Sequence, residues 1–179
     1  MKQYALAVLF VVMSVLLRML PHPWNFAPII GIGLFCGAYL PKRWAIIVPV
    51  LAMALGDLML GFVPVNLFGW VAVALTAVLG FALRRKRSPM RVVGTSLLGS
   101  ALFFLISNFG VWALGCGQGW YGPNLSGLAA CYAAGVPFFR TSILGDMLYT
   151  GVLFGSYELS TRWIAQRSSP TAVTVSGPR

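Results

Sequence analysis

The sequence predicts an all-α integral membrane protein, and three observations predict that class. Hydrophobic residues make up 59% of the 179 residues and charged residues 9%, whereas about 25% of a soluble domain is charged. Several apolar runs approach the roughly 20 residues with which a helix crosses a hydrocarbon core about 30 Å thick. Basic residues lie between these runs, as they do in the loops of membrane proteins. We expect one transmembrane domain over residues 1–167.

Six spans are predicted, and the first covers residues 4–20. It resembles the apolar part of a signal peptide, but Arg18 follows the run and no small-residue cleavage site precedes Pro21, so we interpret it as an uncleaved span. In the second span, Gly33 and Gly37 form a small-xxx-small pair that permits close helix packing. The second to sixth spans are predicted over residues 27–40, 44–62, 67–83, 92–114 and 141–158.

Two further segments do not fit a full crossing. Residues 125–139 are apolar, but they are short and end at VPFF. We expect them to form a short helix that lies at the interface or is re-entrant. Residues 168–179 are polar, and their composition is typical of a disordered cytoplasmic tail.

The distribution of Lys and Arg predicts the orientation. An N-terminus on the inner side leaves only Arg18 and Arg140 on the outer side. The inner residues are then Lys2, Lys42, Arg43, Arg84, Arg85, Lys86, Arg87, Arg91, Arg162, Arg167 and Arg179. Basic residues favour the cytoplasmic side, so we expect both termini in the cytoplasm and a multi-pass protein of the cell inner (cytoplasmic) membrane. A full crossing by residues 125–139 would reverse the last span, which the charges disfavour.

Charge and cysteine content exclude some classes of protein. The net charge is +10, but the basic residues are spread over loops and do not form one face of a soluble fold, so no nucleic-acid partner is expected. The three cysteines have no zinc or redox spacing. Cys116 and Cys131 either form a disulfide or are small buried hydrophobes, as Cys36 is expected to be.

Polar side chains within the apolar runs predict a site. Asp57 in ALGDLMLG, Asp146 in ILGDMLYTG and Asn108 in SNFGVW each lie five or six residues from the outer end of a span. Acids in membranes usually face the bundle interior or a wet cavity. We therefore expect a pocket open to the outside. The alternatives are a structural network, in which Arg140 pairs with an aspartate, and a proton-titrating pair.

Aromatic and amide residues in the outer loops complete the predicted site. Trp24 and Asn25 lie in one loop, and Trp120 and Tyr121 lie in another. Such residues could close a small-molecule pocket, although Trp and Tyr also form the ordinary aromatic belt of membrane proteins. The predicted binding residues are Asp57, Asn108, Asp146, Asn25, Trp24, Trp120, Tyr121 and Arg140.

Catalytic, metal and cofactor sites are not expected. His22 is the one histidine of the sequence, and no positioned nucleophile or acidic cluster accompanies it. The sequence also contains no P-loop. We therefore do not expect an enzyme.

Four segments occur in an order that resembles a known family: HPWNFAPIIGIGLFCGAYL, VPVLAMALGDLMLG, LFFLISNFGVW and LSGLAACYAAGVPFFRTSILGDMLYTGVLFG. They resemble an uncharacterised family of small six-span bacterial proteins described as transport proteins, over residues 15–158. That family is similar to the substrate-binding subunits of energy-coupling-factor vitamin transporters. The resemblance implies six spans, both ends inside and a pocket for a vitamin or cofactor-like solute near the outer face.

The resemblance and the residues together predict capture of a small solute from the outer face and assistance in its uptake. The resemblance also implies an energising ATPase module as a partner. The first span departs from that pattern, because it contains Ala5 and Ala7 but no Ala-xxx-Ala series for docking. The alternative function is a non-transporting membrane scaffold or assembly factor that packs through its glycine-rich helices.

Overall fold

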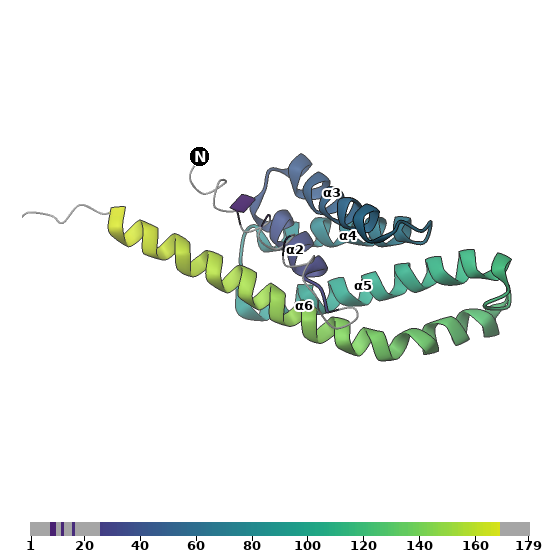
Figure 1. The fold of residues 1–179 in the computed structure, drawn as a ribbon. Coiled ribbons are helices and arrows are strands. Elements are labelled where there is room, and N and C mark those ends of the chain that lie inside the picture. The colour runs from purple at the N-terminus through teal and green to yellow at the C-terminus, as the bar shows by residue number, and fades with distance from the viewer. Residues whose placement is uncertain (1–7, 10–11, 13–15, 17–25, 169–179) are drawn as a thin grey trace, which may run out of the picture.

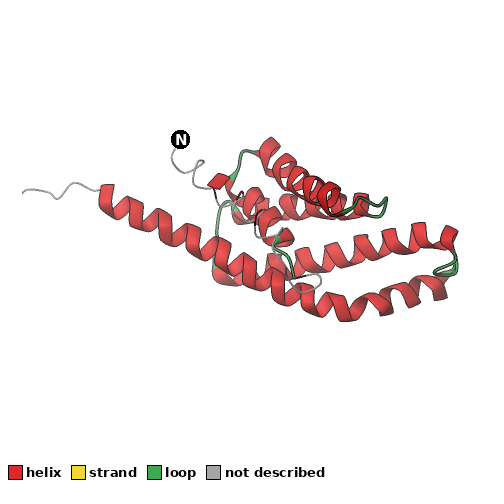
Figure 2. Cartoon of the chain, in the orientation of Figure 1, coloured by secondary structure: helices red, strands yellow, loops and turns green. Residues whose placement is uncertain are grey.

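The structure, a computed structural model, describes residues 8–9, 12, 16 and 26–168 (Figure 1). Helices and the loops between them make up this part of the chain, and it contains no strand (Figure 2). The elements are α2 (Ile29–Tyr39), α3 (Lys42–Leu60), α4 (Asn66–Gly80), η1 (Phe81–Leu83), α5 (Pro89–Gly115), η2 (Cys116–Gln118) and α6 (Leu125–Ser168). The predicted all-α class is confirmed for these residues. The predicted first span lies largely outside them, as does the predicted tail after Ser168.

The helices have the length and surface of membrane-spanning segments. Four of those described are long and apolar enough to cross a membrane, over Lys42–Leu60, Asn66–Leu83, Pro89–Gly115 and Leu125–Arg167. Large apolar side chains on their outer faces are exposed, such as Leu58, Met59 and Leu144. Extended apolar surface of this kind is rare on soluble monomers, whereas a bilayer would cover it. The chain is therefore consistent with a membrane protein.

The helices form two antiparallel hairpins around a central short helix. α3 pairs with α4, α5 pairs with α6, and α2 lies between the two pairs and contacts all four helices (Figure 1). Every residue of α2 from Ile30 to Ala38 is buried. Its 11 residues extend about 17 Å, roughly half the hydrocarbon core. The most hydrophobic helix is thus shielded from lipid by the other four.

Glycines allow α2 to approach α4 backbone to backbone. A methyl group added at Gly37 would collide with the carbonyl oxygen of Ala77, and one added at Gly33 would collide with the side chain of Thr76. On the facing helix, a Cβ at Gly80 would lie 2.5 Å from the carbonyl oxygen of Leu34. The small-xxx-small pair predicted from the sequence therefore packs against α4 of the same chain.

Arg84 holds the C-terminal end of α2. Its Nε donates to the carbonyl oxygen of Gly37 at 2.8 Å, and its Nη2 donates to that of Leu40 at 2.6 Å. The guanidinium also lies 4.5 Å from the centroid of the Phe81 ring. The last carbonyls of a helix lack intrahelical partners and carry partial negative charge. Arg84 thus satisfies two of them and joins the basic loop to α2.

Replacing Arg84 by alanine should lower the free energy of unfolding by about 1–3 kcal/mol, because two charge-assisted hydrogen bonds are lost. Thermal unfolding in detergent measures the effect. The matched control is Arg85→Ala, whose side chain is exposed and whose loss should change stability little. Equal stability of the two variants would contradict the role given to Arg84.

A second contact joins the same loop to α6. The hydroxyl of Tyr39 donates to Glu158 Oε1 at 2.6 Å, and Arg87 Nε lies 3.5 Å from the same oxygen. The Arg87 guanidinium also lies over the Tyr39 ring, 4.7 Å from its centroid. The rings of Phe154 and Tyr157 pack against Tyr39. These contacts hold the C-terminal end of α2 and the basic loop against the second half of α6.

The structure differs from the prediction of a separate short helix over residues 125–139. Those residues are the first part of α6, which continues through Pro137 for 44 residues and about 66 Å. This part lies along α5: Tyr132 donates to the Leu105 carbonyl at 2.7 Å, and the thiol of Cys131 donates to that of Asn108 at 3.4 Å. A proline removes one helical donor, and neighbouring helices make that loss tolerable in membranes. Packing on α5 therefore keeps the helix continuous.

Candidate functional site

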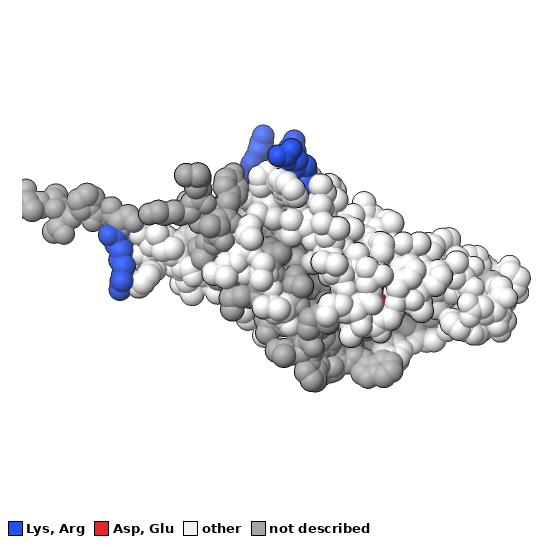
Figure 3. Space-filling model, turned by 45° about the horizontal axis from the view of Figure 1, so that its top comes forward, with Lys and Arg blue, Asp and Glu red and all other residues white. Residues whose placement is uncertain are grey.

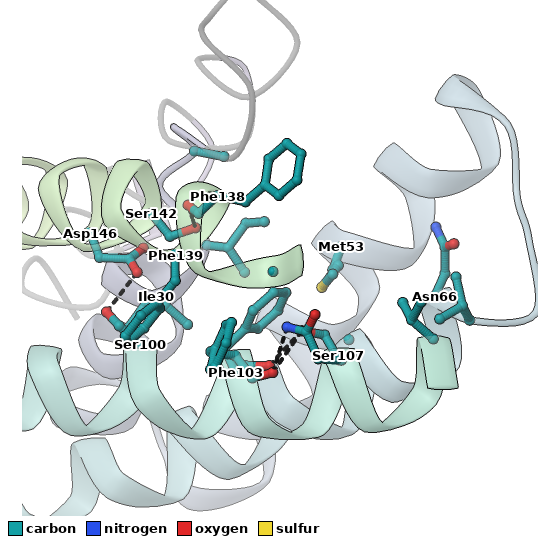
Figure 4. Close-up of a pocket in the computed structure, with 18 of the residues that line it drawn as sticks. Ile30, Met53, Asn66, Ser100, Phe103, Ser107, Phe138, Phe139, Ser142 and Asp146 are labelled. Atoms are coloured by element: carbon teal, nitrogen blue, oxygen red, sulfur yellow. Dashed lines mark hydrogen bonds between the residues drawn. The ribbon is translucent and has the colours of Figure 1, made fainter. Parts of the chain in front are cut away.

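A cavity of about 450 Å³ lies between the α3–α4 hairpin and the α5–α6 hairpin (Figure 4). Each described long helix contributes to its wall, and the N-terminal end of α2 reaches it. The lining residues are Ala27, Ile29, Ile30, Met53, Leu60, Val65, Asn66, Gly69, Ser100, Phe103, Phe104, Ser107, Asn108, Val111, Gly135, Phe138, Phe139, Ser142 and Asp146. Its volume falls within the roughly 300–1,000 Å³ of small-molecule sites.

Aromatic rings form much of the wall. Phe103 and Phe104 come from α5, and Phe138 and Phe139 come from α6. Phe104 and Phe139 stack with centroids 4.5 Å apart and planes 29° apart. Such contacts stabilise the α5–α6 pair and leave flat apolar surface facing the cavity.

Asp146 is the acid of the cavity. Its side chain is 4% exposed, and its Oδ2 accepts a hydrogen bond of 2.6 Å from Ser100 Oγ (Figure 4). The backbone amide of Ile30, in the first turn of α2, also donates to it. The first amides of a helix lack intrahelical acceptors and favour negative charge nearby. Asp146 therefore connects α6, α5 and the start of α2.

Three other polar side chains of the cavity donate to carbonyl oxygens of their own helices. Ser107 Oγ donates to the Phe103 carbonyl at 2.7 Å, and Ser142 Oγ donates to that of Phe138 at 3.1 Å. One amide hydrogen of Asn108 is used in the same way, because Nδ2 donates to the Phe104 carbonyl at 2.8 Å. These three side chains retain acceptor oxygens, and the amides of Asn66 and Asn108 add donor groups to the same wall.

Asp57 has a different environment from Asp146. It is 5% exposed, and its Oδ2 accepts a hydrogen bond of 2.8 Å from Trp70 Nε1. The bond joins α3 to α4. Asp57 is not among the residues that line the described cavity, although Met53 and Leu60 of the same helix are. The structure thus brings Asp146 and Asn108 to one cavity and places Asp57 in a separate contact between helices.

Replacing Trp70 by phenylalanine should lower the free energy of unfolding by about 1–2 kcal/mol, because the buried carboxylate of Asp57 loses a donor. The ring contact between Trp70 and Phe62, at 5.7 Å, would be largely kept. Thermal unfolding of the purified protein checks the change. Trp44→Phe, at an exposed tryptophan of α3, is the control and should unfold like the native protein. A native-like Trp70→Phe would show that this hydrogen bond does not support the fold.

The remaining predicted site residues lie away from the cavity wall or outside the described part of the chain. Trp24 and Asn25 belong to the latter group. Arg140 is exposed on α6. Trp120 is 65% exposed and packs beside Gly115, while Tyr121 is half-buried in the same α5–α6 loop. The structure therefore does not bring these loop aromatics to the cavity.

The cavity lies at the end of the bundle that is remote from Lys42, Arg43 and the basic loop, and Arg140 is the basic residue nearest to it in sequence, between the lining residues Phe139 and Ser142. It is formed by the C-terminal half of α3, the middle and C-terminal part of α5, the N-terminal ends of α2 and α4, and the first half of α6. Lys42 and Arg43 begin α3, and the basic loop follows η1 at the opposite end. In Figure 3, the blue side chains lie at the left and at the upper centre of the face shown, and the right part shows only a small red area among white residues.

One comparison with known proteins assigns the chain to a family. A model of a family of unknown function, DUF6580, matches residues 1–170. The chain belongs to the DUF6580 family. No curated protein and no solved structure matches it significantly. Family membership therefore assigns no activity, and the function of this DUF6580 chain has to be argued from its cavity.

Sequence reasoning missed the aromatic wall and the three serines of the cavity, Ser100, Ser107 and Ser142. Phe103, Phe104 and Phe138 occur in runs that otherwise face lipid, so apolar character alone did not distinguish them. A periodic signal was nevertheless present, because Ser100 and Asn108 are eight residues apart and share one helical face. Ser142 and Asp146 are four residues apart, so they too share one helical face.

Proposed function

We propose that the chain binds a small solute in the cavity between the two hairpins and assists its uptake across the membrane. The observation that carries the proposal is the cavity itself: an apolar, largely aromatic wall with a few convergent polar groups, at Asp146, Ser100 and Asn108. Small-molecule sites have this composition, in which apolar surface supplies affinity and a few polar groups fix orientation.

The proposal includes a direction. We propose six spans, both termini in the cytoplasm and location in the inner membrane. The cavity is then open toward the outer side, since it lies at the bundle end opposite Lys42, Arg43 and the loop of residues 84–91. Basic residues mark the cytoplasmic side. A solute would therefore be captured from outside.

The alternative of a scaffold that packs through glycine-rich helices receives less support. Gly33 and Gly37 face α4 of the same chain, where Thr76 and Ala77 fill the space beside them. That surface is not open to a second protein. A vitamin or cofactor-like solute and an energising ATPase module extend the proposal through the resemblance noted above.

Filling the cavity tests the proposal. We expect Ser142→Phe to place a ring in the cavity and to abolish retention of a co-purified small molecule, detected by native mass spectrometry of gently extracted protein. The matched control is Leu144→Phe on the same helix, at a side chain that is 66% exposed. The control should retain the ligand.

Two outcomes would count against binding in this cavity. One is retention of the same small molecule by Ser142→Phe, and the other is loss of the molecule from both variants. Thermal unfolding of each variant separates a filled cavity from a misfolded protein, because an exchange that fills space without strain costs little stability.

A further inference from the structure

The polar groups of the cavity select for a particular solute chemistry, and this inference rests on the proposed function. The carboxylate of Asp146 is acceptor-only when ionised. Ser107 and Ser142 use their hydroxyl hydrogens within their own helices and present oxygens. A solute that contacts Asp146 and these two serines must bring hydrogen-bond donors, because a buried acceptor without a donor is costly.

The charge of the lining residues narrows the class of solute further. Among the described residues that line the cavity, Asp146 is an acid and none is Lys, Arg or His. Ser100 and the amide of Ile30 neutralise the carboxylate only through dipoles. An anionic solute would approach a like charge in a low dielectric, where repulsion is strong. A cationic solute would supply the missing opposite charge.

The position of the aromatic rings indicates that the solute contains a flat aromatic group. Figure 4 shows Phe139 close to the end of the cavity where Asp146 meets Ser100, with Phe103 and the ring of Phe138 farther along. Ring faces attract cations within about 6 Å and stack on flat aromatic groups. Asp146 lies two helical turns from Phe138 and Phe139 on α6. An elongated molecule can therefore contact the acid with its charged end and the rings with its flat body.

We infer that the cavity takes an organic cation with an aromatic body, whose protonated nitrogen donates to Asp146 and whose ring packs against the phenylalanines of α5 and α6. Asn108 then contacts the far end of the solute. Specificity against anions comes from Asp146, and specificity against simple inorganic cations comes from the apolar wall.

Three probes that share an indole body and differ in charge test the inference. They are tryptamine, which is cationic at pH 7, the neutral tryptophol and the anionic indole-3-acetate. Binding to the full chain in nanodiscs is measured by isothermal titration. We expect tryptamine to bind at least tenfold more tightly than tryptophol, and indole-3-acetate to bind more weakly than both.

Two variants test whether Asp146 causes the preference for tryptamine over tryptophol. Asp146→Asn should bind tryptamine and tryptophol about equally, and retained tryptophol binding shows that the variant is folded. The control is Glu158→Gln, at an acid near the basic loop, which should keep the native preference. If Asp146→Asn does not fold, the ranking of the three probes on the native chain still tests whether the cavity prefers a cationic solute.

The results distinguish the inference from the proposed function. Equal binding of the three probes to the native chain, or a preference for indole-3-acetate, overturns the inference and leaves a solute-binding cavity. A tryptamine preference that persists in Asp146→Asn overturns the role of that residue. Binding of none of the probes also overturns the inference, whereas the proposed function fails only if Ser142→Phe retains the co-purified molecule or if both Ser142→Phe and Leu144→Phe lose it.

Discussion

Gly37→Ala is expected to lower the free energy of unfolding by about 3 kcal/mol, the upper part of the range for an overpacked core. The added methyl would overlap the carbonyl oxygen of Ala77 and lie 2.7 Å from the Cα of Gly80. Both obstacles are backbone atoms, so no side-chain rotation can relieve them. α2 and α4 must separate, and the loss should appear as a lower midpoint of thermal unfolding in detergent.

Gly155→Ala is the matched control for Gly37→Ala. Gly155 lies within α6, and nothing within 4 Å would meet its added Cβ. Alanine is a better helix former than glycine by about 1 kcal/mol, so this variant should be unchanged or slightly more stable. If Gly37→Ala were as stable as Gly155→Ala, the close contact between α2 and α4 would be wrong.

Asp146→Leu is expected to destabilise the fold by about 2–3 kcal/mol, because it removes an acceptor that serves two other helices. Ser100 has an alternative, since its hydroxyl lies 3.0 Å from the carbonyl oxygen of Ser96. The amide of Ile30 loses its side-chain acceptor at the start of α2, where the helix itself supplies none. The cost should therefore come mainly from α2.

Comparison with Ser100→Ala tests whether the cost of Asp146→Leu comes mainly from the lost contact to α2. The serine variant removes one donor and leaves the contact between Asp146 and Ile30 in place, so it should cost about 1 kcal/mol. Chemical unfolding followed by tryptophan fluorescence gives both values. A larger loss for Ser100→Ala than for Asp146→Leu would mean that Asp146 does not support α2. Replacement of Asp146 should also open the first turn of α2 to hydrogen exchange, whereas Gly155→Ala should not.

Much of the helical plan could be predicted from the sequence. The spans expected over 44–62, 67–83 and 92–114 correspond closely to α3, to α4 with η1, and to α5. Length and hydropathy suffice for this, since a helix is the way for an apolar segment to satisfy its own backbone in lipid. Spacing from the outer ends also indicated Asn108 and Asp146, which line the cavity.

Other features depended on contacts between segments far apart in the chain. Pro137 and the short apolar run before it indicate a helix end locally, and only packing along α5 keeps α6 continuous. The sequence around Glu158 does not identify its partners. In the structure it contacts Tyr39 and Arg87, which lie on other segments. Sequence periodicity describes one helix at a time, so it cannot select among partners on different helices.

The sequence by itself therefore determined that the chain is helical and apolar, which segments form α3, α4 and α5, and that acids are buried among them. The tertiary structure alone decided that Asp57 meets Trp70 while Asp146 meets Ser100 at the cavity. The physical reason is the cost of a polar group in an apolar interior. That cost requires each acid to have a donor, but the donor's identity is set by which helix faces pack together.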